Sequence, residues 1–483
     1  IRPLRRTAMP AERDVTRPVR TTTRRAPGTA RMPGRPRRAG VLGLVAALAL
    51  GACSDEEILP GERFDVRTPL EASLPDEQGR IPDAESVQPA RQNESRPISL
   101  PAPVNHAAWT HRGGTAAHRI RHPALGARLS PVWSVRIGAG DSRRAAITAD
   151  PVVAGGRVFT LDAAAQAMAH STAGAALWSR SLVPASDNPG DATGGGLALG
   201  AGRLFVTTGF GRLHALDPET GEVLWTQRFD APVDGAPTVA GDLVYVASRD
   251  SRAFAVRVSD GRLQWQLPGT PTPSSVIGGA GPAVSDRLAI FPFGSAELVA
   301  ALRQGGIRVW SATLAGQRLG RAYAGFSDVT GDPVIDGRRV YAGSPAGRIA
   351  ALDAGTGERL WTATEGAMSP VWPVGGSVFA VTDASQLVRL DGRDGSVIWA
   401  VDLPEFQNER PRRRQAVYAH HGPVLAGGRL LVASDDGALR AFDPRDGRLV
   451  SQTPLPGGAT TNPVVVAGVL YLVTSDGRLH AFR

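Results

Sequence analysis

Short runs of apolar residues recur along most of the chain, and each run is followed by a bend rich in glycine, aspartate or arginine. In the most regular copy, between Gly202 and Trp225, the β-prone residues Leu204, Phe205 and Val206 stand between two such bends. Glycine at a bend is free to adopt the positive φ that tight hairpins require. The pattern therefore predicts antiparallel strand-turn-strand units.

The copies end at comparable tryptophans, which indicates a repeat of whole sheets. Successive spacings between these tryptophans are 47, 40, 45, 51 and 38 residues. Four-stranded propeller blades repeat about every 40 to 50 residues. A tryptophan at this place would pack between neighbouring blades, where its ring N–H also needs an acceptor. We expect such inter-blade docking from Trp178, Trp225, Trp265, Trp310, Trp361 and Trp399.

Counting the copies predicts an all-β fold, an eight-bladed propeller over residues 129–483. The seventh copy carries Val450-Ser451 where a tryptophan is expected, and the eighth, from Asn462, stops at Arg483 before a fourth strand. Residues 131–137 have the form of that strand and contain Trp133, so we expect them to close the ring and hide sheet edges. The seven full copies span 145–183, 196–230, 235–268, 281–315, 331–364, 370–403 and 423–455.

The composition agrees with a β fold and excludes several kinds of site. With 42% hydrophobic residues, 57 Gly and 38 Pro, the chain fits neither a disordered protein nor a helical bundle. Its one cysteine excludes an internal disulfide and metal sites held by several thiolates. All 54 basic residues are arginines, from which no function follows.

The amino-terminal residues 1–52 read as a basic extension and a secretion signal. Arg35 to Arg38 form a basic region, Val41 to Leu50 an apolar one, and Leu50-Gly51-Ala52-Cys53 follows. The apolar run is about half of the roughly 20 residues that a membrane-spanning helix needs. We expect translation to start at Met32 and export by the Sec route, with the paired Arg37-Arg38 leaving a twin-arginine route as the alternative. A lone cysteine at this junction by chance is the plain alternative to lipidation.

The positive charge is concentrated before Cys53. Residues 1–52 hold 12 of the 54 arginines and two of the 45 acidic residues, so the remainder has 42 basic and 43 acidic residues. Such a balance offers no overall field for nucleic acid. From Ser54 to about Leu100 the chain is rich in proline and charge, so it cannot fold alone and is expected to be a tether. Residues 53–128 are thus predicted as tether and pre-propeller segment.

Two sets of motifs resemble a known family. Ala215-Leu216-Asp217 with Thr220-Gly221 and Trp225 resembles the tryptophan-docking repeat of pyrroloquinoline-quinone (PQQ) enzymes and their non-enzymatic relatives, and the Cys53 motif resembles a bacterial lipobox. Together they are similar to the BamB family, lipoproteins of the outer-membrane β-barrel assembly machinery. Short flanking motifs look like alphaproteobacterial members: Leu59-Pro60-Gly61-Glu62-Arg63, Trp109, Gly113-Gly114, His118 and His122.

The resemblance implies a lipid anchor on Cys53 and a place at the periplasmic face of the outer membrane, where Ser54 fits outer-membrane sorting. It implies a non-catalytic scaffold without cofactor that binds a POTRA domain of BamA, joins its complex and assists unfolded barrel precursors. The partner loops would be Asp328-Val329-Thr330, after Ser327, and Val276-Ile277-Gly278. Thr330 and Ile277 depart from the expected Asp and Arg, which favours a mostly apolar contact around one carboxylate. Asp328 as a plain turn cap is equally compatible with the sequence.

A PQQ-dependent dehydrogenase, or another periplasmic propeller that binds ligands, is the alternative of a different class. By resemblance, such enzymes need a vicinal disulfide, a calcium ion and a catalytic aspartate, whereas Cys53 is the only cysteine and precedes the repeats. Histidines at 106, 111, 118 and 122 lack metal-site spacing, so loop packing is expected and no metal is predicted.

A basic insertion lies between the sixth and seventh copies. It runs from Pro404 to Gly422, with a cluster from Arg410 to Arg414 and the pair His420-His421. An acidic partner, lipid headgroups or plain solvation would each suit such a cluster.

Overall fold

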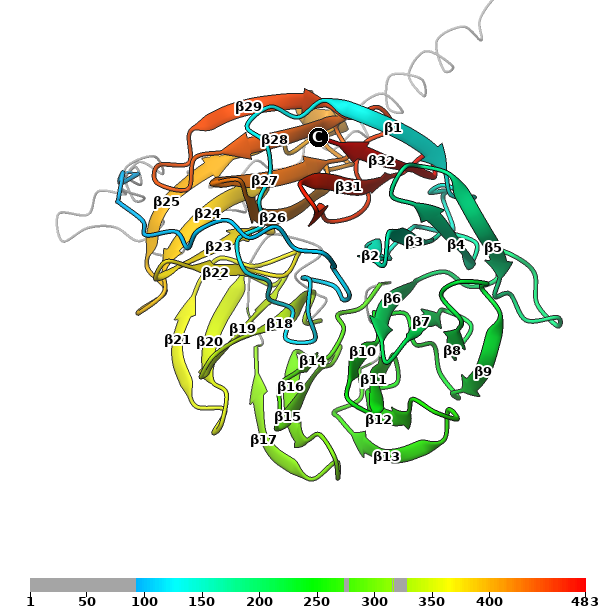
Figure 1. Ribbon diagram of the computed structural model, residues 1–483. Coiled ribbons are helices and arrows are strands. Elements are labelled where there is room, and N and C mark those ends of the chain that lie inside the picture. The colour runs from blue at the N-terminus through cyan, green and yellow to red at the C-terminus, as the bar shows by residue number, and fades with distance from the viewer. Residues whose placement is uncertain (1–92, 273–277, 315, 317–327) are drawn as a thin grey trace, which may run out of the picture. The chain divides into compact units, whose positions relative to one another are not determined.

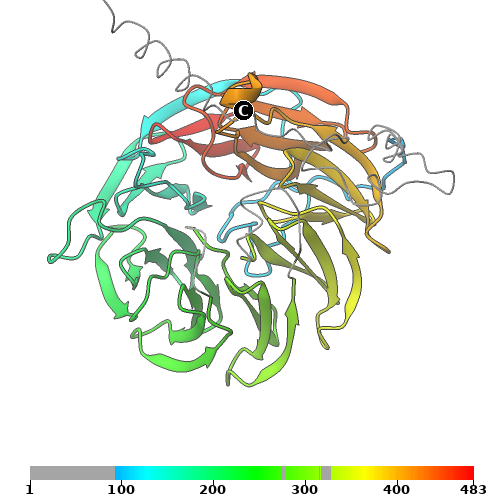
Figure 2. The same cartoon turned by 180° about the vertical axis from the view of Figure 1, so that it is seen from behind.

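The computed structural model describes residues 93–483 except for 273–277, 315 and 317–327. These residues form eight four-stranded antiparallel sheets arranged as the blades of a propeller (Figures 1 and 2). The prediction of an all-β, eight-bladed ring is confirmed. In the part of the chain that the structure describes, no helix is long and apolar enough to cross a membrane.

The blades follow one another in chain order, and each is a meander whose innermost strand comes first. Blades 1 to 4 consist of β2 (Val152–Ala154), β3 (Arg157–Leu161), β4 (Gln166–Ser171), β5 (Ala176–Ser181); β6 (Gly195–Gly200), β7 (Arg203–Thr208), β8 (Arg212–Leu216), β9 (Val223–Arg228); β10 (Thr238–Ala240), β11 (Leu243–Ser248), β12 (Arg252–Arg257), β13 (Leu263–Pro268); β14 (Ala283–Val284), β15 (Leu288–Pro292), β16 (Glu297–Leu302) and β17 (Arg308–Thr313).

Blades 5 to 7 repeat the same order, and blade 8 combines both ends of the ring. They consist of β18 (Gly331–Asp336), β19 (Arg339–Ser344), β20 (Arg348–Asp353), β21 (Arg359–Ala363); β22 (Trp372–Val374), β23 (Ser377–Val381), β24 (Gln386–Asp391), β25 (Val397–Asp402); β26 (His420–Ala426), β27 (Arg429–Ser434), β28 (Ala438–Phe442), β29 (Leu449–Pro454); and β30 (Val464–Val466), β31 (Val469–Thr474), β32 (Arg478–Phe482) with β1 (Pro131–Arg136).

The eighth blade closes the ring as the sequence predicted. Strand β1 supplies its outer strand and pairs antiparallel with β32, with Trp133 opposite Ala481. Ser130 and Arg483 exchange backbone hydrogen bonds of 2.8 and 2.9 Å. Both ends of the ring are therefore tied into one sheet, which leaves no open blade edge between them.

The core lies between the blades because their middle strands are apolar on both faces. In β7, Leu204, Phe205 and Val206 are buried, and Phe205 packs with Val244 of the next blade. The outer strands, such as β9, alternate between exposed and partly buried positions. Each blade thus buries two faces, and only its rim meets water.

Seven tryptophans on outer strands dock against the next blade in one recurring geometry. Trp178 donates its ring N–H to the Pro218 carbonyl at 3.0 Å and covers Gly221. A Cβ on Gly221 would lie 2.5 Å from that ring, and its φ is +69°, so the turn needs glycine on both counts. The same donation, between 2.9 and 3.3 Å, is made by Trp133, Trp225, Trp265, Trp310, Trp361 and Trp399.

The missing tryptophan of the seventh blade has a structural reason. Ser451 pairs with Ala441 at the position that the tryptophans occupy in other blades. A tryptophan there would need the turn between the third and fourth strands of blade 8. Those strands are β32 and β1, which come from opposite ends of the ring. No such turn links them, so the docking surface for a ring does not exist at this junction.

Residues 93–100, which the composition assigned to the tether, lie against blades 6 and 7. Asn93 exchanges side-chain hydrogen bonds with the backbone of Ala400, at 2.9 and 3.0 Å, and Glu94 donates its backbone N–H to Ile398 at 3.0 Å. Arg389 of blade 6 donates to the carbonyls of Arg96 and Pro97. A count of apolar residues misses this segment because it is held by backbone and side-chain hydrogen bonds to a preformed sheet.

Candidate functional site

Residues 104–125 cover one face of the ring, where the first and second strands of each blade turn. Backbone hydrogen bonds join this segment, called the plug below, to six blades. The side chain of His111, also in the plug, reaches a seventh blade: its Nε2 accepts a hydrogen bond from the backbone N–H of Val239 in blade 3 at 3.1 Å. The backbone partners are Val153, Leu199, Val284, Ile335, Gly427 and Ala467.

Arg112 of the plug points into the central channel and pairs with carboxylates from opposite sides of the ring. Its Nε lies 3.0 Å from Asp332 of blade 5 and 3.4 Å from Asp150, which precedes blade 1. The Asp332 side chain is completely buried. Burial raises the pKa of Asp332 to about 6, although the Arg112 guanidinium acts in the opposite direction. Arg112 therefore connects the plug to carboxylates from two distant blades.

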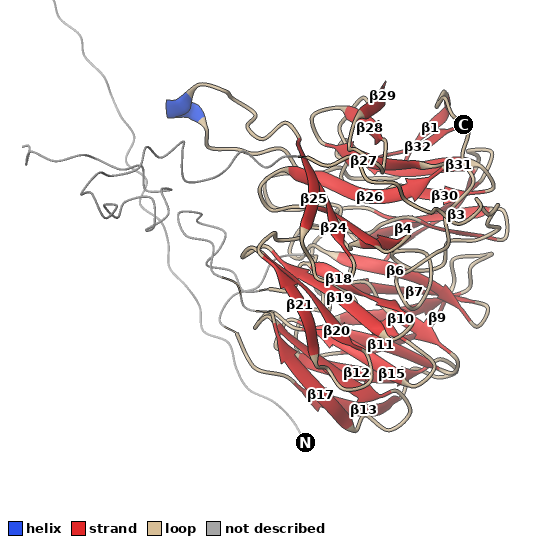
Figure 3. Ribbon diagram, turned by 90° about the vertical axis from the view of Figure 1, so that its left-hand side faces the viewer, coloured by secondary structure: helices blue, strands red, loops and turns tan. Residues whose placement is uncertain are grey.

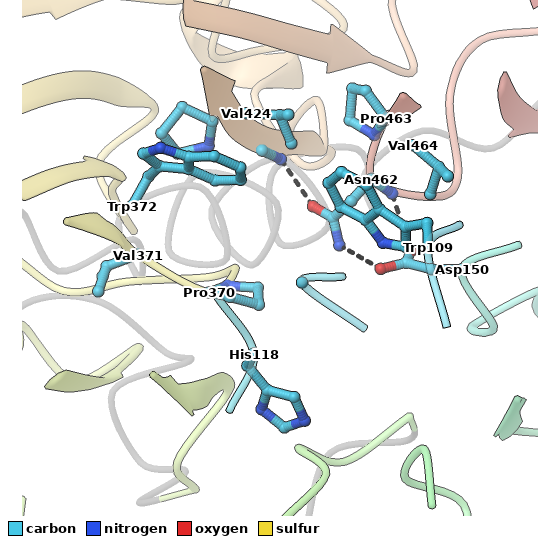
Figure 4. Close-up of a pocket in the computed structure, with 13 residues that line it drawn as sticks. Trp109, His118, Asp150, Pro370, Val371, Trp372, Val424, Asn462, Pro463 and Val464 are labelled. Carbon is cyan, nitrogen blue, oxygen red and sulfur yellow. Dashed lines mark hydrogen bonds between the residues drawn. The ribbon is translucent and has the colours of Figure 1, made fainter. Parts of the chain in front are cut away.

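Asp150 is also held by blade 8. Asn462 donates its side-chain N–H to Asp150 at 2.8 Å and its backbone N–H at 2.9 Å, beside Trp109 of the plug (Figure 4). Asn462 in turn accepts the N–H of Gly422 at 2.7 Å. This chain of hydrogen bonds links the inner strands of blades 7, 8 and 1 behind the plug.

The four histidines of the plug region all make packing contacts. His118 lies with Nδ1 2.9 Å from the Pro333 carbonyl, and His122 accepts the N–H of Gly428 at 2.8 Å. His106 lies with Nε2 2.8 Å from the Arg121 carbonyl. Among the residues that the structure describes, no three His, Cys, Asp or Glu side chains are arranged to hold a metal ion.

The predicted partner loops lie on the opposite face, where the chain crosses from one blade to the next. The loops before blades 4 and 5 line one small pocket of about 40 Å³, the loop pocket, to which they contribute Gly279, Ala280, Asp328 and Val329. Gly278 directly precedes this lining, whereas Val276 and Ile277 lie outside the described residues. Folding thus brings together two segments about 50 residues apart in the sequence.

Burial differs among the predicted contact residues. Asp328 is 7% exposed and Val329 is 3% exposed and part of an inter-blade cluster. Thr330 donates its hydroxyl to the Ala367 carbonyl at 2.7 Å, a bond to the loop before blade 6. A partner would therefore meet the mouth of the loop pocket rather than a protruding aspartate.

Sequence reasoning missed the charged pair of the loop pocket. Arg249, from the turn between β11 and β12, forms an ion pair with Asp234, and both line the pocket with Asp328. Asp234 is buried, whereas the Arg249 side chain is 35% exposed. Arg249 supplies a basic group to this site, although Ile277 replaces the arginine that the family pattern led us to expect.

The channel opens on this same face into a polar mouth of about 440 Å³. Its lining includes Asp141, Asp150 and Asp435, with Arg112 at the plug side. Burial raises the pKa of Asp141 and Asp435. This opening, the acidic mouth, holds three carboxyl groups and one arginine.

A ring of eight four-stranded sheets with tryptophan-docked junctions defines the class: a PQQ-like β-propeller. The sequence pattern of the family described as outer membrane protein assembly factor BamB matches residues 165–401 and 406–483, so the chain belongs to this family.

Relatives with this description are distant in sequence. The BamB of Shewanella oneidensis is 26% identical over 358 residues, which cover 72% of this chain and 87% of the relative. That of Escherichia coli is 23% identical over 340 residues, 59% and 83% of the two chains.

Solved structures agree on the fold. BamB from Moraxella catarrhalis superposes with a TM-score of 0.61 at 19% identity, covering 74% of this chain and 100% of that one. A quinohemoprotein alcohol dehydrogenase from Comamonas testosteroni superposes with a TM-score of 0.60 at 15% identity, covering 78% of this chain and 80% of that one. These likenesses show the propeller alone, because assembly factors and enzymes share it.

Proposed function

We propose that this chain is a non-catalytic scaffold for the assembly of β-barrel proteins in the outer membrane. In this proposal it belongs to the BAM complex and binds a POTRA domain of BamA through the loops before blades 4 and 5. The observation that carries the proposal is the convergence of these loops on one pocket, with Asp328 and Arg249 in its lining. Family membership supplies the biological setting.

The plugged face strengthens the choice of the loop face. The plug hydrogen-bonds to seven of the eight blades through its backbone and His111, so it occupies the turns that a partner would otherwise contact. The loop face instead presents a partly exposed Arg249 and a pocket between blades. Interfaces gain most binding energy from residues in well-packed pockets that become fully desolvated on binding.

Outer strands offer a second contact, by strand addition, to unfolded barrel precursors. At blade 6 the chain itself covers an outer strand: the Asn93 side chain and the Glu94 backbone N–H hydrogen-bond to β25, and Ile398 is only 3% exposed. At the matching position of blades 1 and 2, Leu177 is 47% and Leu224 is 45% exposed. Replacing Leu177 and Leu224 by lysine should weaken capture of a urea-diluted barrel precursor, because charge blocks strand pairing. Equal capture would remove this role and leave BamA binding untouched.

An enzyme of the PQQ-dependent class is the rival. The sequence has one cysteine, Cys53, so the vicinal disulfide of those enzymes has no counterpart in this chain. Purified protein that carried a quinone or calcium in stoichiometric amount would favour the rival.

The partner assignment is tested by Asp328→Arg. The variant should retain less BamA in pulldowns from crosslinked membranes, because a second cation would face Arg249 in the loop pocket. Asp187→Arg, an exposed position in the loop before blade 2, is the matched control. Since Asp328 is buried, thermal unfolding of both variants checks the fold, and Arg249→Ala repeats the test without placing a new charge. Undiminished BamA with both pocket variants would contradict the loop assignment.

The anchor is tested separately. Cys53 lies outside the described residues, and its lipidation rests on the signal motif. The variant Cys53→Ser should move the protein from the membrane fraction to the soluble periplasmic fraction, because one or more acyl chains supply the membrane affinity. An unchanged membrane fraction would contradict the anchor.

A further inference from the structure

The insertion between blades 6 and 7 is an ordered arm, residues 404–419, that stands away from the blades (Figure 3). Its two sides are joined by backbone hydrogen bonds from Gln407 to Ala416 and from Tyr418 to Glu405, of 3.0 and 2.8 Å. At its base, His420 bridges the Ser434 hydroxyl and the Pro404 carbonyl at 2.7 and 2.8 Å. The arm is therefore a built feature and not a slack loop.

The tip of the arm concentrates positive charge. The short 3₁₀ turn Pro411–Arg413 lies within a run that holds four arginines and no acidic residue between 410 and 414. Arg414 stacks over Phe406, 4.9 Å from the ring centre, and pairs with Glu409 at 3.6 Å. Arg412 and Arg413 are exposed, and within the described chain the structure gives neither an acidic partner.

An apolar groove of about 330 Å³ lies between the arm and blade 6. Its apolar lining comes from Val381 of β23, Met368 of the preceding loop, and Val417 and Tyr418 of the arm. Met368 is 48% and Val417 is 51% exposed, so the groove offers apolar surface to a partner. The arm thus carries exposed arginines at its tip and one wall of an apolar groove at its base, a combination suited to an extended segment that holds both aliphatic and acidic residues.

The described chain begins next to this arm. Going backward from Glu94, beside Ile398, to Asn93, beside Ala400, the chain runs along β25 toward Asp402, and the arm starts two residues later. The preceding residues therefore enter the structure at the foot of the arm.

Those preceding residues complement the arm in charge and pattern. Residues 53–92 contain ten acidic residues and four arginines, a balance of −6. Within them, residues 76–87 hold four acidic residues and one arginine. Ile81 and Val87 flank Asp83 and Glu85 at every second position, so in an extended chain these four side chains lie on one face. The six residues from Val87 to Asn93 span up to roughly 20 Å, enough to reach back over the groove.

We propose that the arm and its groove bind residues 76–87 of the same chain. The aliphatic side chains occupy the trough, and the carboxylates meet Arg412 and Arg413. Docking would shorten the length of chain between Cys53 and the propeller. The segment would then leave the propeller from the side of blades 6 and 7. This arrangement does not depend on BamA binding.

The test is hydrogen-deuterium exchange of residues 76–92 in the full chain. These amides should exchange about tenfold more slowly in the wild type than in Arg412→Glu/Arg413→Glu, because docking protects them. Arg143→Glu/Arg144→Glu is the matched control: an exposed adjacent pair in another loop of the same face, which should keep the protection. Adding Asp83→Arg/Glu85→Arg to the arm variant should restore it.

Two outcomes would overturn the proposal. The first is equal exchange of residues 76–87 in the wild type and the arm variant, with unchanged thermal unfolding. In the second outcome, residues 76–87 again exchange equally in both proteins, and the arm variant also loses binding to phosphatidylglycerol vesicles. This result would assign the arm to anionic lipid instead.

Discussion

The two faces of the ring are built from opposite kinds of contact. On one face a single continuous segment, the plug, hydrogen-bonds to blade after blade and places Arg112 in the channel. On the other face, separate loops from neighbouring blades surround the loop pocket, the acidic mouth and the arm. The plugged face holds Arg112 between two buried carboxylates, whereas the loop face exposes part of Arg249 and the arginines at the tip of the arm. Substitutions on the two faces should therefore separate stability from binding.

The largest expected effect comes from Arg112→Ala. It would leave Asp332 and Asp150 buried without their cation, which typically costs about 3 to 5 kcal/mol. We expect this loss in urea unfolding followed by tryptophan fluorescence.

Arg119 is the matched control for Arg112. It lies in the same plug and pairs with Asp336 at 3.2 Å, but both side chains are about one third exposed. Arg119→Ala should cost less than about 1 kcal/mol, because water screens the pair. If both variants lost the same free energy of unfolding, Arg112 would not stabilise the plug through its buried carboxylates.

The next largest effect on stability should come from acid, which lowers the free energy of unfolding through the buried histidines of the plug. Burial, together with His118, lowers the pKa of His111 to about 3, and burial lowers that of His118 to about 4. Both are neutral when folded, so the unfolded state binds more protons once the pH falls below about 6.5, and stability falls with it. Each histidine should cost about 2 kcal/mol at pH 5 relative to pH 7.5, whereas Asp332, with its raised pKa, offsets part of this loss.

His118→Gln isolates this contribution. The variant should start from a lower stability at pH 7.5 but lose about 2 kcal/mol less than the wild type on going to pH 5. Urea midpoints at the two pH values measure the difference. Parallel losses in both proteins would mean that His118 is not held neutral in the plug.

The ring itself could be predicted from the sequence because its signals are local and repeated. Six of the docking tryptophans follow a bend glycine by four residues, and the strand around Trp133 fits the gap left after Phe482. Even Ser451, an exception in the pattern, marks the junction where two ends of the ring meet. Periodicity reports such features because every blade solves the same packing problem.

The plug and the loop pocket could not be predicted in this way. Arg112 pairs with Asp332 across 220 positions of sequence, and Arg249, from a turn of blade 3, lines the same pocket as Asp328, which precedes blade 5. Neither pairing has a local spacing rule, since the ring brings the partners together. The histidines at 111 and 118 were expected to pack in loops, but their acceptor and donor groups belong to blades 3 and 5.

The smallest effect on stability should come from the loop pocket, where Arg249→Ala removes an ion pair between the buried Asp234 and an arginine that is 35% exposed and reached by water. We expect a loss of at most about 1 kcal/mol in urea unfolding, and a double-mutant cycle with Asp234→Asn should give a coupling of that size. The same variant should nevertheless lower the amount of BamA retained, because a partner would lose a cation at the mouth of the pocket. A large loss of stability with unchanged retention would make the pocket a structural junction and erase the contrast between the two faces.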